Sequence, residues 1–370
     1  MEDFFKRIEI QYNNTLPFVA YRKPNSSIVN ALFQKDSELY IAETFLENGF
    51  VFSPFDDAES TILIPLNNSD KDEVVFEVTV ENRSANKNSE VSVDETLKHI
   101  KLINKGIEAI KNNQFTKVVL SRKETVPLLE SHPISIFKRL LNSYPSAFVY
   151  YWYHPKVGLW LGATPETLIK IEGNHFSIMA LAGTQDYKGT TDVIWKDKEK
   201  KEQQIVTDFI TDRLKPSVEN LKLSETETIK AGSLLHLRTM ITAQLKPEKS
   251  NLKQLVFDLH PTPAVCGLPK LAAKKFILEN ENYNRDFYTG FLGELNFERV
   301  ITPRSSKKNI ENRAYNITKK STQLYVNLRC MQLQGNNANI FIGGGITETS
   351  NPEAEWEETV SKSKIIKSIL

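Results

Sequence analysis

The hydrophobic pattern of the chain changes character near residue 90. Before that point, short apolar runs at 37–45 and 60–65 are separated by polar turns, a pattern that predicts strands and loops. Residues 81–90 carry no core-forming pattern and are interpreted as a linker or exposed loop. Directly after them, apolar residues recur at helical spacing, which predicts a helix over 93–113.

From residue 114 onward the pattern predicts longer strands and well-marked helices. Strands are expected at 118–120, 147–153, 158–163, 290–297, 323–334 and 339–343, and helices at 132–143, 192–214, 252–259, 268–279 and 353–370. The strands come in pairs and hairpins instead of alternating with helices, so we expect an α+β fold. It would be one large domain of mainly antiparallel β-sheets flanked by helices, in which 1–90 adds divergent N-terminal strands to the main region 91–370.

Charge and composition narrow the function classes. The 370 residues include 47 lysines and arginines against 46 aspartates and glutamates, so no global positive field would gather nucleic acid. An anionic ligand would need local cations. The basic segment 302–320 is interpreted as a solvated connection between strands. The two cysteines, Cys266 and Cys330, suit a reducing compartment and cannot build a Cys-rich zinc site.

The sequence also bears on location. Residues 1–12 lack the pattern of a secretion signal, and no apolar run approaches the ~20 residues of a membrane-spanning helix. We therefore expect a cytoplasmic protein without nucleic-acid or membrane partners, and a monomer is the simplest expectation.

Two single charged residues in apolar surroundings are candidates for proton transfer. With strand alternation, Lys117 shares a face with Phe115 and Val119. It is either an edge lysine that reaches solvent or a desolvated lysine able to act as a base near neutral pH. Glu166 follows Pro165, which interrupts a strand pattern. It is either a turn glutamate in water or a partly buried acid with a raised pKa, ready to give a proton.

Two Glu-x-x-Glu pairs lie near the starts of predicted helices. Glu199 and Glu202 share one helix face, and Glu202 continues the apolar stripe of its helix, which favours an inward-facing side chain. Glu355 and Glu358 repeat the spacing in the last helix, with Lys362 one turn further along the same face. The pairs are either unrelated surface acids, or they converge and offer oxygen ligands to a hard cation such as Mg²⁺.

Other residues could hold or approach an anion. Arg329 lies in an apolar segment, where a lone guanidinium would be costly, so we expect a carboxylate partner from the protein or a ligand. Gly343, Gly344 and Gly345 follow a strand and allow the backbone to approach a ligand closely. His260 stands in a proline-rich turn. A lone histidine is usually structural, and the constrained turn raises the weight of a functional role.

Eight segments in sequence order carry a family resemblance. They are FTKVVLSR (115–122), GATPETL (162–168), ALAGT (180–184), KKEQQIV (200–206), LHPTPAVCG (259–267), DFYTGFLGEL (286–295), LRCMQL (328–333) and GGGITETSNPEAEWEETVSK (343–362). Together they resemble the chorismate-utilising enzymes, which include isochorismate, salicylate, anthranilate and aminodeoxychorismate synthases. The resemblance covers about 93–370 and implies that 91–370 is the chorismate-binding catalytic region.

Two positions indicate the branch of that family. Its water-adding members carry a lysine before VVLSR, and Lys117 occupies that position. Ala182 stands where aminodeoxychorismate synthases often carry a lysine nucleophile. The sequence is therefore most similar to the isochorismate synthases, and whether the product would feed menaquinone or a catechol siderophore stays open.

The resemblance implies a role for each candidate. Lys117 would deprotonate a water that attacks C2 of chorismate, and Glu166 would protonate the C4 hydroxyl as it leaves. Mg²⁺ would bind the ring carboxylate. The implied Mg²⁺ ligands are Glu202 and Glu358, assisted by Glu199 and Glu355. The implied substrate-binding residues are Gly183, Thr184, His260, Tyr288, Arg329, Gly344 and Lys362.

Two departures and two alternatives accompany this interpretation. Gln203 stands where the family often has His, and Ala180 stands where Pro is common. A salicylate synthase would share the lysine and the glutamates but would also eliminate pyruvate from isochorismate. A non-catalytic chorismate-binding protein would not need Lys117 and Glu166 together.

Overall fold

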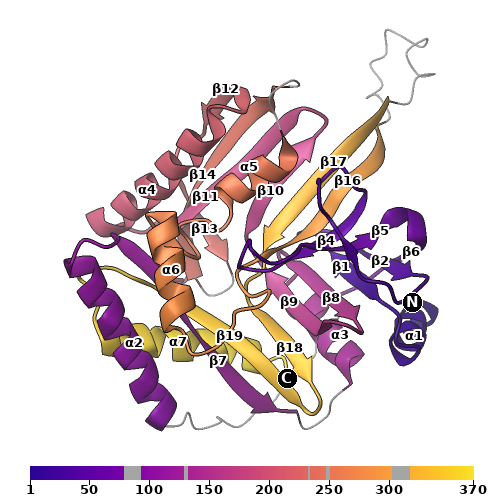
Figure 1. The fold of residues 1–370 in the computed structure, drawn as a ribbon, viewed down its shortest axis with the longest axis horizontal. Coiled ribbons are helices and arrows are strands. Elements are labelled where there is room, and N and C mark those ends of the chain that lie inside the picture. The colour runs from indigo at the N-terminus through magenta and orange to yellow at the C-terminus, as the bar shows by residue number, and fades with distance from the viewer. Residues whose placement is uncertain (79–92, 129–131, 232–233, 247–250, 302–316) are drawn as a thin grey trace.

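The computed structural model describes residues 1–78, 93–128, 132–231, 234–246, 251–301 and 317–370. The described residues form helices and two β-sheets, with runs of consecutive strands between the helices (Figure 1). The helices are α1 (Glu2–Asn13), α2 (Val93–Lys111), α3 (Pro133–Ser143), α4 (Asp197–Leu214), α5 (Leu252–Leu259), α6 (Lys270–Asn280) and α7 (Pro352–Lys367), with a 3₁₀ turn η1 at Leu66–Asn68. None of the helices in these ranges is long and apolar enough to cross a membrane.

The described residues form two sheets in which every strand pairs antiparallel with its neighbours. Sheet A has the order β15-β7-β19-β18-β9-β8-β1-β2-β6 and sheet B the order β12-β14-β11-β10-β17-β16-β4-β5-β3, with β13 also on β14. The strands of sheet A are β1 (Phe18–Arg22), β2 (Ile28–Gln34), β6 (Ser69–Val75), β7 (Lys117–Pro127), β8 (Phe148–His154), β9 (Gly158–Thr164), β15 (Gly267–Leu268), β18 (Cys330–Gln334) and β19 (Asn337–Ile346). Those of sheet B are β3 (Tyr40–Ile41), β4 (Gly49–Ser53), β5 (Ile62–Pro65), β10 (Thr167–Glu172), β11 (His175–Asp186), β12 (Val218–Leu223), β13 (Glu227–Ala231), β14 (Leu234–Leu245), β16 (Phe291–Ile301) and β17 (Ile317–Val326).

The two sheets pack face to face, and strand β8 shows why its residues 148–152 are all apolar or aromatic. Phe148 and Tyr150 belong to the cluster between the sheets, where the ring of Phe148 stacks on Tyr325 of β17 with centroids 4.0 Å apart. The intervening Val149 and Tyr151 belong to a second cluster, on the outer face of sheet A. Because successive side chains of a strand point to opposite faces, a strand buried on both faces has no polar positions to spare.

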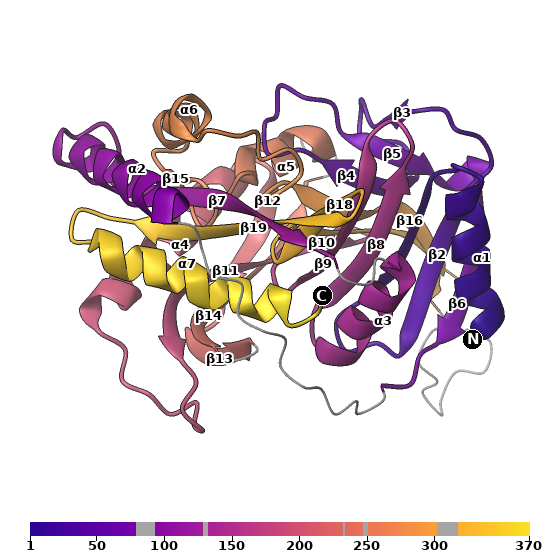
Figure 2. The ribbon, with the colours of Figure 1, turned by 90° about the horizontal axis from the view of Figure 1, so that it is seen from below.

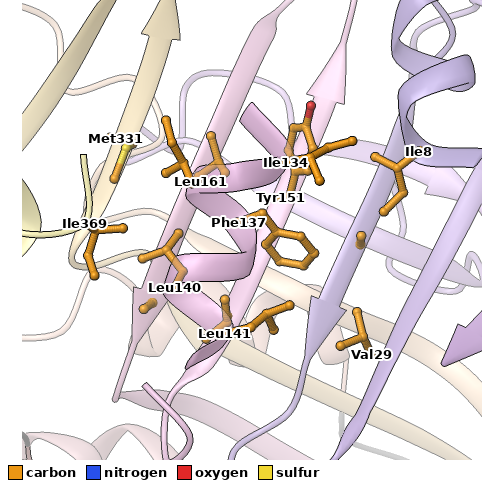
Figure 3. Packing of buried hydrophobic residues seen from close by; sticks show 14 of the residues in the cluster. Ile8, Val29, Ile134, Phe137, Leu140, Leu141, Tyr151, Leu161, Met331 and Ile369 are labelled. Carbon is orange, nitrogen blue, oxygen red and sulfur yellow. The ribbon is translucent and has the colours of Figure 1, made fainter. Parts of the chain in front are cut away.

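Helices cover the outer faces of this sandwich. Phe137 and Leu140 of α3 pack onto Tyr151 and Leu161 of sheet A (Figure 3). Each such fully buried side chain contributes roughly 2–3 kcal/mol through the apolar surface it removes from water. Helices α4 and α5 share one buried cluster with sheet B, and α2 and α6 pack against β7. Helix α7 runs along β19 (Figure 2).

The predicted fold class is confirmed: the chain is α+β with mainly antiparallel sheets flanked by helices. The expected helix at 93–113 is α2, and the expected hairpin at 147–163 is the β8–β9 pair. The N-terminal strands join both sheets. The predicted linker 81–90 lies outside the described residues, as does 302–316 of the basic connection.

Three element predictions are wrong. The first ninety residues also contain helix α1, whose buried Phe4, Phe5 and Ile8 form the apolar stripe that holds it to the sheet. The apolar run 37–45 forms only the two-residue strand β3. The single strand expected at 323–334 is two strands, β17 and β18, because the chain turns at 327–329, where Arg329 has a φ of +47°.

Candidate active site

A cavity of about 300 Å³ lies where β7 and β19 of sheet A meet β11 and β14 of sheet B, α4 and α7. Segments far apart in the sequence form its wall. The predicted site residues that line it are Lys117, Glu166, Gly183, Thr184, Glu199, Glu202, Tyr288, Arg329, Gly344, Glu355, Glu358 and Lys362. Ala182 lines it too, so the position at which aminodeoxychorismate synthases often carry a lysine nucleophile also belongs to this cavity.

Lys117 opens strand β7 and is desolvated. Lys117 and Val119 both line the cavity, as strand alternation predicts, and Lys117 is only 9% exposed. Its Nζ forms an ion pair with a carboxylate oxygen of Glu202. Gly345 on the paired strand β19 leaves room for it, because a Cβ there would lie 3.2 Å from Lys117 Cε. The edge lysine reaching solvent is therefore excluded.

Glu166 sits in the break between β9 and β10 and is 7% exposed. Burial raises its pKa to about 7, and the nearby charge of Lys117 limits the rise. The break is held in place by β17: Thr164 donates its hydroxyl hydrogen to the Val326 carbonyl at 2.6 Å, and the Val326 N–H donates to the Glu166 carbonyl at 3.0 Å. A carboxyl group in this setting keeps its proton to neutral pH and can donate it.

Helix α4 presents Glu199 and Glu202 from its first turns. Its buried face is set by Gln203, Val206 and Ile210. The expectation that Glu202 itself continues the core-facing stripe is therefore wrong by one residue. Glu202 lies beside that face, which is why its carboxylate reaches the cavity and Lys117 instead of the apolar interior.

The two departures from the family pattern touch each other. The side-chain amide of Gln203 donates to the backbone carbonyl of Ala180 at 2.9 Å and to Thr239 Oγ1 at 3.1 Å. These bonds join α4 to β11 and β14 directly behind the cavity. The departures thus form one local substitute contact, which holds the helix that carries Glu202.

Helix α7 presents the second acidic pair. Asn351 caps the helix by accepting the Ala354 N–H at 2.8 Å. The sheet-facing side of α7 is made by Trp356, Thr359 and Ser363, which leaves Glu355, Glu358 and Lys362 to line the cavity.

The acidic pair of α7 is only partly engaged. The Lys362 ammonium pairs with Glu358 at 2.6 Å and donates to the Gly343 carbonyl at 3.0 Å. Burial raises the pKa of Glu355, a side-chain hydrogen bond with Ser350 limits the rise, and the adjacent Glu358 adds to it.

The acidic side chains of this cavity suit a hard cation in their chemistry. Four carboxylates from two helices face one space, and Glu199 Oε2 is buried without a hydrogen-bond partner among the described residues. In the described ranges no three acidic, histidine or cysteine side chains converge closely enough to form a closed metal cage. Mg²⁺ is commonly held by one or two carboxylates, water and the anionic groups of its ligand, so an open set of this kind fits it.

Arg329 provides a positive charge that no acidic side chain among the described residues neutralises. It lines the cavity and, within the described part of the chain, forms neither an ion pair nor a side-chain hydrogen bond. Burial lowers the pKa of this guanidinium. The sequence predicted a carboxylate partner from the protein or a ligand; no carboxylate in the described ranges takes that place, and a ligand partner stays a prediction.

The packing of Tyr288 on one side of the cavity explains why residue 343 is a glycine. Tyr288 stacks on Phe341 with ring centroids 5.4 Å apart, and its hydroxyl crosses Gly343, where a Cβ would lie 2.8 Å from Tyr288 Oη. Two glycines of the run 343–345 thus make space for side chains of this protein, Tyr288 and Lys117, whereas the sequence suggested space for a ligand.

His236 lines the cavity and was missed by sequence reasoning. Its Nδ1 lies 2.9 Å from the Gly183 carbonyl, which can only accept, so Nδ1 carries the hydrogen and Nε2 is left as an acceptor. Burial lowers its pKa, so the ring is neutral at pH 7. A polar residue alternating with leucines in 234–237 was the available signal, the same kind that pointed to Lys117.

The expectation that His260 lines the pocket is wrong. It follows α5 with a fully buried ring that meets Phe291 edge-on at 5.0 Å, and it is absent from the cavity wall. Burial lowers its pKa to about 3, so it is a neutral core residue. The proline-rich turn points it into the protein and not toward the cavity.

Comparison with known proteins agrees with this arrangement. The family model described as "Chorismate binding enzyme" matches residues 46–300, and a second, described in the same words, matches 315–368. Isochorismate synthase MenF of Pasteurella multocida is 29% identical over 284 residues, 72% of this chain and 60% of that protein. Isochorismate synthase EntC of Escherichia coli is 28% identical over 262 residues, 66% of this chain and 60% of that protein.

The fold is also that of a solved structure. The structure of MenF, the menaquinone-specific isochorismate synthase from Escherichia coli, has a TM-score of 0.75 at 19% identity, over 96% of this chain and 89% of that one. The chain spans about 60% of the length of the curated relatives that it matches.

Proposed function

Because the chain belongs to the chorismate binding enzyme family, we propose that it is an isochorismate synthase, an isomerase that adds water at C2 of chorismate while the C4 hydroxyl leaves. One observation carries the proposal: a buried lysine and a buried acid that holds its proton near pH 7 face the same cavity. The names of the curated relatives support the same reaction.

In this proposal Lys117 and Glu166 divide the proton transfers. Lys117 takes a proton from water, whose oxygen forms the new bond to C2. The ring double bonds shift, the bond from C4 to its hydroxyl breaks, and Glu166 supplies the proton with which that oxygen leaves as water. One water enters and one leaves, so the net change is an isomerisation, and each group donates or accepts one proton per turnover.

The remaining polar groups would hold the substrate dianion. Arg329, which has no protein partner in the described ranges, and Lys362 would pair with substrate carboxylate. Gly183, Thr184, Tyr288 and Gly344 line the same cavity, and their backbone amides and hydroxyls would assist in holding the substrate. With a net charge of only +1, the protein has no global positive field, so local cations such as these would have to bind an anionic substrate.

The proposed cofactor is Mg²⁺, with Glu202 and Glu358 as ligands and Glu199 and Glu355 beside them. The ion would neutralise and orient the ring carboxylate. Glu202 then has two tasks, because its carboxylate also pairs with Lys117. A Glu202 carboxylate engaged as a ligand is withdrawn from the lysine, so the two sites are not independent.

The test is turnover of chorismate by the purified protein with Mg²⁺ and with EDTA, the products being resolved by chromatography. Isochorismate formed only with metal supports the proposal and its cofactor. Salicylate together with pyruvate would replace it by a salicylate synthase. No product in either condition, with chorismate still bound in calorimetry, would leave a non-catalytic binding protein. The expected monomeric state and cytoplasmic location remain predictions.

A further inference from the structure

Strand β7 lacks a neighbouring strand along part of one edge, from Val119 onward, two residues after Lys117. The two-residue strand β15 pairs with Lys117 and Val118, and the Val119 N–H donates to the Cys266 carbonyl at 2.8 Å. Beyond that point no strand of the described residues continues on this edge. The next backbone groups on the edge, the Val119 carbonyl and the Ser121 N–H, still need partners because they are buried.

Two side chains supply those partners. Arg285 Nη2 donates to the Val119 carbonyl at 2.7 Å, and Glu281 Oε1 accepts the Ser121 N–H at 2.7 Å. A strand would offer the same sequence of donor and acceptor at these positions. The pair therefore takes the place of a missing strand along two residues of β7.

The Glu281–Arg285 pair is buried and is joined by two hydrogen bonds. Arg285 Nε and Nη2 donate to the two oxygens of Glu281 at 2.7 and 2.6 Å, and each side chain is 1% exposed. A bidentate arginine–carboxylate pair fixes both planes, so little freedom remains to the groups that it binds.

The same arginine reaches two other parts of the cavity wall. Its Nη1 donates to the Val265 carbonyl and to Thr289 Oγ1, both at 3.2 Å. Val119, Val265 and Thr289 all line the cavity. One buried pair thus connects three wall segments that are more than 100 residues apart at the extremes.

We propose that the Glu281–Arg285 pair positions Lys117 for its proton transfer, by completing the edge of β7 and fixing it against the segments that carry Val265 and Thr289. The pair is a positioning element: neither side chain lines the cavity. The proposal rests on the role proposed above for Lys117 as the base. A general base works only within hydrogen-bond reach of its proton, so a small displacement of β7 would reduce catalysis more than binding.

A second buried pair in the same protein provides a matched control. Glu294 on β16 is 6% exposed and bonds Lys23, Arg299 and the Tyr21 hydroxyl between the sheets. None of these four residues lines the cavity. Glu294→Gln therefore removes a comparable buried carboxylate without touching the edge of β7.

The experiment compares Glu281→Gln and Glu294→Gln with the unmodified full chain. Three quantities are measured: thermal unfolding, amide hydrogen exchange in peptides that cover 117–121, and kcat and KM with chorismate and Mg²⁺. For Glu281→Gln we expect faster exchange in 117–121 and a fall in kcat of about 10- to 100-fold with KM within about threefold. For Glu294→Gln we expect a lower unfolding temperature, with exchange in 117–121 and kcat unchanged.

Ser121→Ala is the milder second variant. It removes the hydroxyl that donates to Glu281 at 2.9 Å and that also lies 2.7 Å from the Tyr283 hydroxyl, and it leaves the Glu281–Arg285 ion pair in place. If Glu281→Gln does not fold, this variant decides, with a fall in kcat of about 2- to 10-fold expected for the lost hydrogen bonds of the Ser121 hydroxyl. Unchanged exchange in 117–121 in the folded variants, or equal losses of kcat in Glu281→Gln and Glu294→Gln, would overturn the proposal. If the unmodified protein forms no isochorismate, the proposed function fails, and the exchange data still decide whether the pair holds β7.

Discussion

The cavity has two unlike walls. The sheets contribute Lys117 and Glu166, single residues that are almost fully buried, whereas the acidic pairs come from the first turns of α4 and α7 and stay half-buried or exposed. Strands of a sandwich are covered on both faces, so a charged residue there is desolvated and its ionisation changes, as the raised pKa of Glu166 shows. Helix starts emerge at the edge of the packing, where carboxylates keep access to water and to a cation.

The acidic pairs of α4 and α7 also differ from each other, in the burial of the lysine with which each forms an ion pair. Glu202 pairs with Lys117, a buried lysine 85 residues away on the opposite wall. Glu358 pairs with Lys362, one turn along its own helix, and these side chains are 44% and 32% exposed. Identical Glu-x-x-Glu spacing therefore gives one carboxylate that joins the two walls and one that does not.

The largest expected effect is a loss of activity when Lys117, on the wall formed by the sheets, is replaced. Lys117→Ala should lower kcat by ~10³-fold, within the range that general bases contribute, while chorismate still binds. Steady-state kinetics and calorimetry measure the two parts. Lys123→Ala, which removes an exposed lysine from the same strand, is the control and should keep full activity. If the kcat of Lys117→Ala stayed within tenfold of that of the unmodified protein, Lys117 would not be the general base, and the sheets would not supply the proton transfer.

The second prediction concerns the pH dependence of Glu166. Its pKa rises from 4.5 to about 7 on folding, so the folded state binds more protons between these pH values and stability falls as pH rises through that window. The full cost above pH 7 is ~3 kcal/mol at about 1.4 kcal/mol per pKa unit. Glu166→Gln lacks this cost, so its stability advantage over the unmodified chain should grow from pH 4.5 to 8.

Urea unfolding of both proteins across that pH range measures the difference. A stability difference that does not change with pH would mean that Glu166 is not desolvated. Turnover should also fall above about pH 7, because Glu166 is then deprotonated and has no proton to donate to the leaving hydroxyl.

The third prediction concerns the helix wall. Glu202→Gln and Glu358→Gln should each weaken Mg²⁺ binding by at least about tenfold, as the loss of groups around a metal commonly does. Titration calorimetry with Mg²⁺ in the presence of chorismate measures it. Glu357→Gln, an exposed neighbour on α7 that is not part of the cavity lining, serves as the control. Equal Mg²⁺ affinity in all three variants would exclude these carboxylates as ligands.

The smallest effect separates the two pairs in the metal-free protein. Glu202→Gln leaves the buried Lys117 ammonium without its carboxylate and should cost roughly 1–3 kcal/mol of stability. Glu358→Gln removes an exposed pair within one helix and should cost no more than ~0.5 kcal/mol. Chemical denaturation without metal measures both, and equal losses would show that the burial of Lys117 does not distinguish the pairs.

Much of the site was predictable because its members obey local rules. Strand alternation placed Lys117 and Val119 on one face, and helical spacing placed Glu355, Glu358 and Lys362 on another. Two failures have a common cause. The interior face of α4 begins at Gln203 and not at Glu202, and His260 turns into the core, because neighbouring elements decide which side of a helix or turn is covered.

The sequence by itself determined the class of fold, most of the helices and strands, and the residues that share each face, since these follow from periodicities along the chain. Only the tertiary structure decided that Lys117 meets Glu202 and that Arg329 lines the cavity without a carboxylate partner among the described residues. It also decided that Glu281 and Arg285, four residues apart in the loop after α6, take the place of a missing strand. Those outcomes depend on which surfaces of two packed sheets come together, and the free energy that selects them belongs to contacts between distant segments, which no local pattern records.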